Sequence, residues 1–187
     1  PLLLKMDNGT FKQIILSLSL VLCGFLSAFA QERPTSVADV LASLPSDGCV
    51  CADYNLTVFA PKNTKISYVG KLWWQNGGLF RVEGDGYSIF CNGEHIWTVD
   101  STAGEIVREE AVSVDELIPS AGSGESEMNV SWSPDGKRLT KIYLTMKNGT
   151  AVSIAVPSMT FVESKSSDFF TYNEKSIPSG FVFTPLD

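Results

Sequence analysis

Apolar and polar residues alternate along much of the chain between residues 55 and 156, which is the period of a β-strand with one buried face. A period of two points every second side chain to the same side, so each apolar set is expected on one face of a sheet. The apolar members of these runs are Leu56, Val58, Ile66, Tyr68, Leu72, Trp74, Phe80, Val82, Ile142, Leu144, Met146, Val152, Ile154 and Val156. Their polar neighbours Lys71, Gln75, Arg81 and Glu83 are expected to face water on the other side.

Turn-forming sequences separate these runs. They are Asn76-Gly77-Gly78, Gly84-Asp85-Gly86, Asn92-Gly93, Pro134-Asp135-Gly136 and Asn148-Gly149. Asn-Gly and Asp-Gly pairs favour the tight turns of β-hairpins, so neighbouring runs are predicted to pair as an antiparallel meander. Strands do not alternate with helices along the sequence, which argues against a parallel sheet.

Two short segments have helical patterns. The first begins at Ser36, ends before Pro45, and has an apolar face formed by Val37, Val40, Leu41 and Leu44. The second spans residues 112–118 and is followed by a Ser/Gly-rich run, 121–126, that is expected to be a mobile loop. A sheet with one apolar face must bury that face, and these two helices are the only cover that the pattern offers. Three outcomes stay open: a closed barrel, a half-barrel with the helices as a lid over an apolar cavity, and a filled core.

The first 30 residues resemble an upstream extension followed by an export signal. After residues 1–5 come a polar region with Lys12, an apolar run over 14–25, and the small-x-small sequence Ala28-Phe29-Ala30. Cleavage after Ala30 is expected to leave residues 31–187 as a single exported domain. The apolar run is too short to span a bilayer comfortably.

Composition argues against several classes of function. With 14 Lys and Arg against 21 Asp and Glu, the formal net charge is −7, whereas nucleic acids and anionic membrane surfaces are bound by basic proteins. The only histidine, His95, has no nucleophile or carboxylate at a fixed spacing. The acidic pairs Glu109-Glu110 and Asp115-Glu116 consist of adjacent residues, whose side chains diverge. The chain is therefore expected not to be an enzyme and to need no cofactor and no metal.

Three cysteines follow the export signal: Cys49, Cys51 and Cys91. A bridge between Cys49 and Cys51 would be badly strained. Two alternatives stay open, a disulfide from Cys91 to one of the other two and three free thiols.

Four segments, in order along the chain, carry motifs that occur together in one protein family. Residues 70–82 (GKLWWQNGGLFRV) contain a Gly-x-Leu-Trp strand, a turn and a Phe-Arg strand, and residues 89–100 (IFCNGEHIWTVD) contain a strand, a turn and a Trp-containing strand. Residues 140–150 form a hairpin pattern, and residues 168–181 contain Phe-Phe and Pro-x-Gly-Phe sequences. In this order the motifs resemble the periplasmic outer-membrane lipoprotein carrier family (LolA-like), over nearly all of residues 31–187.

The resemblance implies a mainly β fold: one strongly curved antiparallel sheet, an open half-barrel, with short lid helices over an apolar cavity. It implies a periplasmic carrier that takes the acyl chains of lipoproteins from an inner-membrane release complex to an outer-membrane acceptor. The partners are then acylated lipoproteins or other lipids, without nucleic acid, and the protein is expected to be a monomer. The cavity residues are expected to be Leu56, Val58, Leu72, Trp74, Phe80, Val82, Ile142, Leu144 and Ile154, with lid contacts from Asn76, Val40, Leu41 and Leu44.

The sequence departs from the family at the signature turn. Asn76-Gly77 stands where Arg-Pro is usual, and the resemblance gives that Arg a hydrogen bond to the lid, which Asn76 can make only in a shorter, uncharged form. The connection between Asp115 and Trp132 is short, so a strand or part of the lid is expected to be missing. Two alternative functions follow: an exported relative that binds or senses another lipid, and a non-enzymatic adaptor with a filled core.

Overall fold

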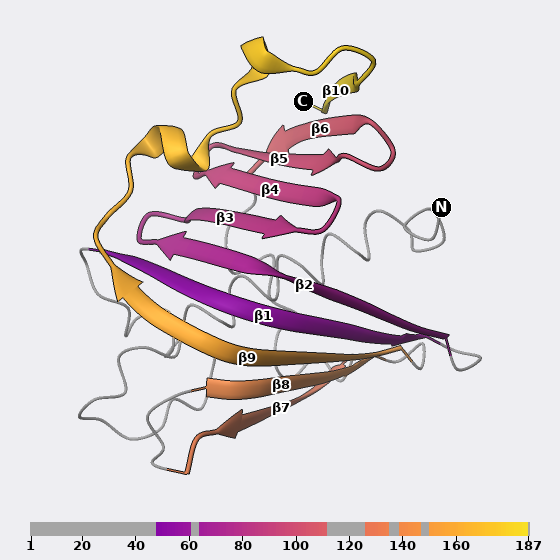
Figure 1. Cartoon of the computed structure of the whole chain (residues 1–187), viewed down its shortest axis with the longest axis vertical. Helices are drawn as coiled ribbons and strands as arrows, with labels where there is room; N and C mark the ends of the chain where they lie inside the picture. Colours follow the sequence, from indigo (N-terminus) through magenta and orange to yellow (C-terminus); the bar gives the residue numbers. More distant parts are fainter. Residues whose placement is uncertain (1–47, 61–63, 112–125, 135–138, 147–149, 187) are drawn as a thin grey trace.

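The computed structural model describes residues 48–60, 64–111, 126–134, 139–146 and 150–186, which form one ten-stranded sheet. The strands are β1 (Cys49–Ala60), β2 (Thr64–Gln75), β3 (Leu79–Gly84), β4 (Tyr87–Asn92), β5 (His95–Asp100), β6 (Glu105–Glu110), β7 (Ser126–Trp132), β8 (Leu139–Met146), β9 (Ala151–Val162) and β10 (Val182–Leu186). Two 3-10 helices, η3 (Ser167–Phe170) and η4 (Glu174–Ser176), lie between β9 and β10. Across the sheet the strand order is β10-β6-β5-β4-β3-β2-β1-β9-β8-β7 (Figure 1).

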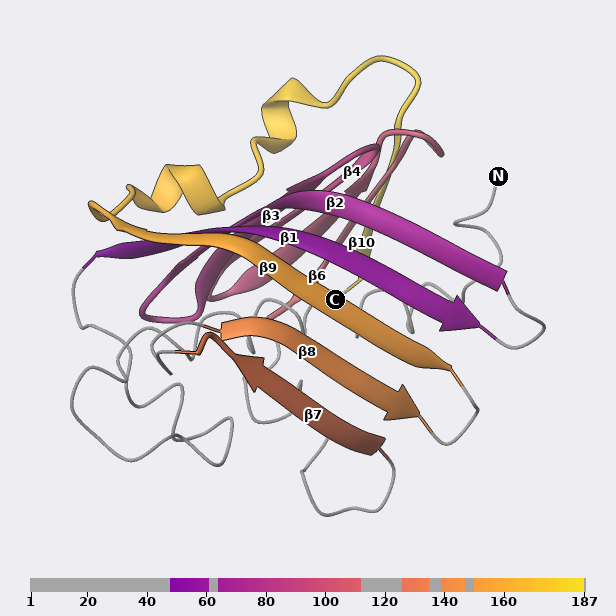
Figure 2. The ribbon, with the colours of Figure 1, turned by 60° about the horizontal axis from the view of Figure 1, so that its bottom comes forward.

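The sheet is bent and open. Among the described strands, β10 and β7 are the two edges, with no pairing between them that would close a barrel. Figure 2 shows the bend, with β1 and β2 near its crest and β7 and β8 descending on one side. This arrangement confirms the prediction of a mainly β fold built on an open, curved sheet. The predicted lid helices, at 36–44 and 112–118, lie outside the described residues.

Three of the predicted turns join neighbouring strands. The turn at 76–78 joins β2 to β3, the turn at 84–86 joins β3 to β4, and the turn at 92–93 leads from β4 to β5. Gly77 and Gly78 have φ angles of +87° and +75°, a left-handed conformation that side chains other than glycine rarely adopt. The turns predicted at 134–136 and 148–149 fall wholly or largely outside the described residues.

Two elements differ from the sequence prediction. Strand β10 pairs with β6 in parallel, Val182 standing opposite Glu105, so the sheet is not purely antiparallel. A tight hairpin reverses the chain and makes the next strand antiparallel. The long connection from β9 to β10, at the far edge of the sheet, is free of this constraint, so β10 can run parallel to β6. The connection between Asp115 and Trp132, where a strand or part of the lid was expected to be missing, contains β7 (Ser126–Trp132), which pairs with β8. The part of this connection before Ser126 lies outside the described residues.

The C-terminal segment, residues 163–181 with η3 and η4, covers part of the convex side of the sheet (Figure 2). Trp97, Val99 and Ile106 are buried beneath it, packed against Phe90, Tyr172, Ile177, Phe181 and Phe183. Strand β5 is buried on both faces: Trp97, beneath this segment, is 4% exposed, and the adjacent Ile96, on the opposite face, is 1% exposed.

Candidate functional site

The described apolar side chains that the pattern assigned to one face do share one face. Residues directly opposite each other in an antiparallel pair point to the same side, and Leu72 stands opposite Val82 as Trp74 stands opposite Phe80. We call this side, which faces away from the C-terminal segment, the inner face, and the other side the outer face. The described inner-face residues that are at most 5% exposed are Val50, Ala52, Tyr54, Leu56, Val58, Leu72, Trp74, Phe80, Val82, Tyr87, Ile89, Cys91, Ile96, Ile142, Val152, Ile154 and Val156.

Eight of the predicted cavity residues belong to this buried set: Leu56, Val58, Leu72, Trp74, Phe80, Val82, Ile142 and Ile154. The ninth, Leu144, stands opposite Val152 in the pairing of β8 with β9, and its side chain is not described. Phe80 is 4% exposed and has Trp74 and Cys91 as cross-strand neighbours.

Of the four predicted lid contacts, only one lies among the described residues. Asn76 is exposed in the turn between β2 and β3, where its Oδ1 accepts a hydrogen bond from the Gly77 N–H at 3.0 Å. Val40, Leu41 and Leu44 lie outside the described residues. The contact between turn and lid therefore stays a prediction.

A row of four residues crosses the inner face from β1 to β4. Tyr54 stands opposite Gly70, Gly70 opposite Gly84, and Gly84 opposite Tyr87. The two tyrosine hydroxyls are hydrogen-bonded to each other above the glycines. Burial raises the pKa of Tyr87 to about 12 and that of Tyr54 further, so both hydroxyls stay neutral. The sequence pattern did not predict this pair, although a glycine inside a strand pattern signals close packing.

Two polar atoms on the inner face have no hydrogen-bond partner in the described part of the chain: the indole Nε1 of Trp74 and Oγ1 of Thr98. Thr98 belongs to this face because it stands opposite Ile89, which in turn stands opposite Val82. Buried polar groups in folded proteins are almost always paired, so each of these two atoms calls for a partner.

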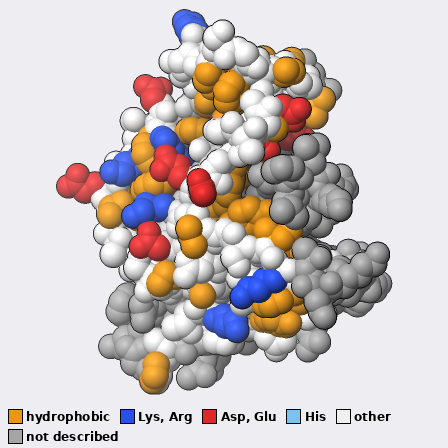
Figure 3. Space-filling view, turned by 45° about the vertical axis from the view of Figure 1, so that its right-hand side comes forward, with side chains coloured by type: hydrophobic (Ala, Val, Ile, Leu, Met, Phe, Trp, Pro, Cys, Tyr) orange, Lys and Arg blue, Asp and Glu red, His pale blue; other side chains and the backbone are white. Residues whose placement is uncertain are grey.

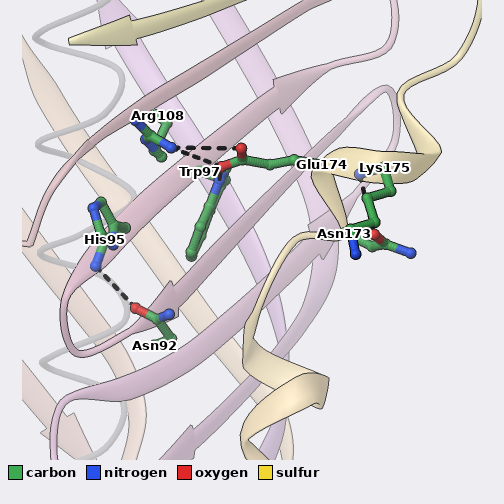
Figure 4. Close-up of polar contacts among 7 residues, drawn as sticks. All are labelled: Asn92, His95, Trp97, Arg108, Asn173, Glu174 and Lys175. Carbon is green, nitrogen blue, oxygen red and sulfur yellow. Dashed lines mark hydrogen bonds and ion pairs between the residues drawn. The ribbon is translucent and has the colours of Figure 1, made fainter.

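The outer face holds the C-terminal segment through a polar cluster that sequence analysis did not find (Figure 4). The Trp97 indole N–H donates to Oε1 of Glu174 at 2.8 Å, and Arg108 donates to the same oxygen at 3.1 Å. The Trp97 hydrogen bond, followed by the Arg108 contacts, lowers the pKa of Glu174. The cluster joins residues 66 and 77 positions apart, a separation that leaves no local sequence signal.

Arg81 also holds the C-terminal segment, which corrects the expectation that it faces water. Its guanidinium lies between the Phe90 and Phe169 rings, 4.7 and 4.6 Å from their centroids, and donates to the Phe169 carbonyl at 3.2 Å. It is also ion-paired with Glu83. Lys71 does reach the surface, where it pairs with Asp53 at 3.2 Å.

The cysteines are free thiols, and a disulfide from Cys91 is wrong. Cys91 points to the inner face, whereas Cys49 and Cys51 point to the outer face of β1, with β2 and β3 in between. Burial raises the pKa values of Cys49 and Cys91 to about 11.

His95 lies at the start of β5, beside the polar cluster (Figure 4). Its backbone N–H donates to Oδ1 of Asn92 at 2.9 Å, and its ring lies 5.6 Å from the Trp97 ring.

The described residues contain no group of three or more His, Cys, Asp or Glu side chains that could hold a metal ion. No helix among the described residues has the length and apolar character that crossing a membrane requires. On the surface shown in Figure 3, acidic and basic side chains are interleaved and hydrophobic ones form small separate patches.

No family model matches this sequence, and neither does any curated protein. Among solved structures, an uncharacterized conserved protein from Thermus thermophilus has a TM-score of 0.50 at 11% identity, over 75% of this chain and 91% of that one. A LolA superfamily protein from Nitrosomonas europaea has a TM-score of 0.46 at 11% identity, over 69% and 92%. An outer membrane lipoprotein-sorting protein domain from Vibrio parahaemolyticus has a TM-score of 0.39 at 8% identity, over 66% and 89%. The chain thus shares the fold of the Thermus thermophilus protein.

Proposed function

We propose that this protein is a non-enzymatic carrier that binds the acyl chains of lipoproteins against its inner face and moves them toward the outer membrane. The observation that carries the proposal is the continuous apolar inner face, which runs across β1 to β5, β8 and β9 with one side-chain parity. Moving hydrocarbon from water to such a surface is favourable by about 0.8 kcal/mol per CH₂ group.

The place of action follows from the export signal. We place the mature protein, residues 31–187, in the periplasm after cleavage behind Ala30. It would act there as a monomer between an inner-membrane release complex and an outer-membrane acceptor. The ordered LolA-like motifs between residues 70 and 181 support this part of the proposal.

A carrier must release what it binds. Several acyl chains buried at once would be held too tightly to leave, so a part of the binding free energy has to be offset by a conformational step. The segment 36–44, with Val40, Leu41 and Leu44, is the proposed lid, and Asn76 is its proposed contact on the sheet. Lid closure would then set both affinity and release.

The test is native mass spectrometry of the protein purified from its own cell envelope, combined with extraction and identification of bound lipid. Co-purified acylated protein supports the carrier. A defined phospholipid or glycolipid supports instead an exported protein that binds or senses lipid. Protein without any bound amphiphile, both before and after incubation with lipoprotein, overturns the proposal in favour of an adaptor with a filled core.

A further inference from the structure

The indole of Trp74 is buried as a donor without an acceptor. Its side chain is 5% exposed, and its Nε1–H has no hydrogen-bond partner in the described part of the chain. The equally buried Trp97 shows the usual arrangement, because its indole N–H donates to Glu174. A buried donor left unpaired is unfavourable, so the Trp74 N–H marks a place where an acceptor binds.

The surroundings of Trp74 limit what that acceptor can be. Its cross-strand neighbour is Phe80, followed by Cys91 on β4, and Leu72 and Val82 form the adjacent row. The buried side chains described on the inner face carry no charge, so a carboxylate or phosphate there would lack a counter-charge. A neutral acceptor attached to a hydrocarbon chain would pair with the indole N–H and would need no counter-charge.

We propose that the Trp74 indole N–H donates a hydrogen bond to the ester carbonyl of an acyl chain bound on the inner face. This inference rests on the proposed function and names its ligand class: acyl esters, in preference to alkyl ethers and plain hydrocarbons. The carbonyl oxygen accepts the hydrogen bond that the protein alone leaves unmade, while the acyl chain lies along the apolar rows.

The test compares two amphiphiles that differ only in the carbonyl, 1-monomyristoylglycerol and 1-O-tetradecylglycerol, titrated calorimetrically below their micelle concentrations. Wild-type protein is expected to bind the ester about tenfold more tightly. Trp74→Phe keeps an apolar aromatic ring but removes the donor, so the ratio should fall to near one. Trp73→Phe is the matched control: Trp73 faces the outer side, where its ring contacts Phe169, and the ratio should stay at the wild-type value.

A second measurement needs no variant that might fold poorly. In wild-type protein, the indole N–H proton resonance of Trp74 should move downfield when the ester binds and not when the ether binds. An unchanged resonance with bound ester, or the same ester-to-ether ratio in wild type and Trp74→Phe, overturns this inference while leaving the carrier function standing. If neither amphiphile binds wild-type protein, the proposed function fails as well.

The acyl ester can come from a lipoprotein or from a membrane lipid. Displacement of 1-monomyristoylglycerol by a triacylated lipopeptide and by a diacyl phosphatidylglycerol separates these sources. Displacement by either supports the ester site, and the more potent competitor identifies the source. Failure of both to displace it overturns the site.

Discussion

The hydroxyl groups of Tyr54 and Tyr87 meet on the inner face, although β2 and β3 lie between the strands that carry them. The contact is made possible by Gly70 and Gly84, which occupy the same cross-strand row and leave the space above the sheet to the two rings. A Cβ on Gly70 would lie 2.6 Å from the Tyr54 hydroxyl, and one on Gly84 would lie 2.7 Å from the Tyr87 hydroxyl. The tyrosines therefore tie four strands together at a point where two strands have no side chains.

The tyrosine pair should be energetically coupled. Tyr54→Phe is expected to lower the free energy of unfolding by about 1–2 kcal/mol, because it removes a buried hydrogen bond. In a double-mutant cycle with Tyr87→Phe, the double variant should lose less than the sum of the single losses, by about 1 kcal/mol. Urea unfolding of the four proteins measures this. Strict additivity would show that the two hydroxyls act independently.

The two glycines should respond differently to added side-chain atoms. In Gly84→Ala, the three atoms nearest to the added Cβ all belong to the Tyr87 side chain, whereas in Gly70→Ala the nearest atom is the backbone carbonyl oxygen of Glu83, followed by the Tyr54 hydroxyl. Each change is expected to destabilise the protein by about 2–4 kcal/mol.

Removing the ring separates the two cases. In a Tyr87→Ala background, adding Gly84→Ala should lower the free energy of unfolding by less than about 1 kcal/mol, because the ring that its Cβ would meet is absent. In a Tyr54→Ala background, Gly70→Ala should remain strongly destabilising, because the backbone carbonyl stays in place. Thermal melts of the six variants test this, and equal relief at both sites would contradict it.

A charge at Phe80 should be poorly tolerated. Phe80→Glu places a carboxylate in a position that is 4% exposed among apolar neighbours, which is expected to cost several kcal/mol, about 3–5, at pH 7. Burial would raise the pKa of the new carboxyl, so part of the stability should return as the pH falls and the group becomes neutral. Phe161→Glu is the control, since Phe161 on the same face is 52% exposed. Similar losses for both variants in urea unfolding would contradict this account.

Acidification should weaken the attachment of the C-terminal segment. The pKa of Glu174 is lowered from its ordinary 4.5 by the Trp97 hydrogen bond and by Arg108, so its ionised form stabilises the fold. That contribution is present above pH 4.5 and is lost as the pH falls through the lowered pKa. Because Glu174 is partly exposed, the effect should be modest, about 2–4 °C in melting temperature.

The comparison variant is Glu174→Gln. It should melt lower than wild type at pH 7, and the gap should shrink as the pH falls below 4.5 and through the lowered pKa. Glu163→Gln, an exposed residue of the same segment, provides the control and should follow the wild-type profile. A pH-independent gap for Glu174→Gln would show that the carboxylate charge is not what holds the segment.

Asn76→Arg tests the proposed lid contact. Asn76 is exposed in its turn, so the change should leave the melting temperature within about 2 °C of wild type. A longer, charged side chain with several donors should hold the lid more firmly and slow the release of bound acyl ester to acceptor vesicles several-fold. Asn76→Lys adds the charge without the planar guanidinium and should have a smaller effect. Release rates equal to wild type in both variants would remove Asn76 from the lid mechanism.

The faces of the central strands could be predicted from the sequence because period two is a local property. Leu72, Trp74, Phe80 and Val82 needed only their own spacing and the glycine-rich turn between them to be placed on one face. Where alternation is weak or the run is charged, the same method failed. No strand was predicted at β6, with the sequence EIVREE, and the residues of β7 were assigned to a shortened connection.

Most of the candidate site depends on both the sequence pattern and the tertiary structure. The sequence marked Trp74 as an inner-face residue, but only the surrounding structure shows that its indole N–H is buried without an acceptor among the described residues. The sequence also left the cysteines open between pairing and free thiols. The order of strands decides this, since it places Cys91 on the opposite face from Cys49 and Cys51.

By itself, then, the sequence determined the alternation, the turns and the membership of the inner face, all of which depend on residues a few positions apart. Only the tertiary structure decided the parallel pairing of β10 with β6, the packing of Arg81 against Phe169, and the Glu174 cluster. These contacts join residues 66 to 88 positions apart. At such separations the partner of a side chain is set by how the whole sheet bends and by where the C-terminal segment crosses it, which no local pattern encodes.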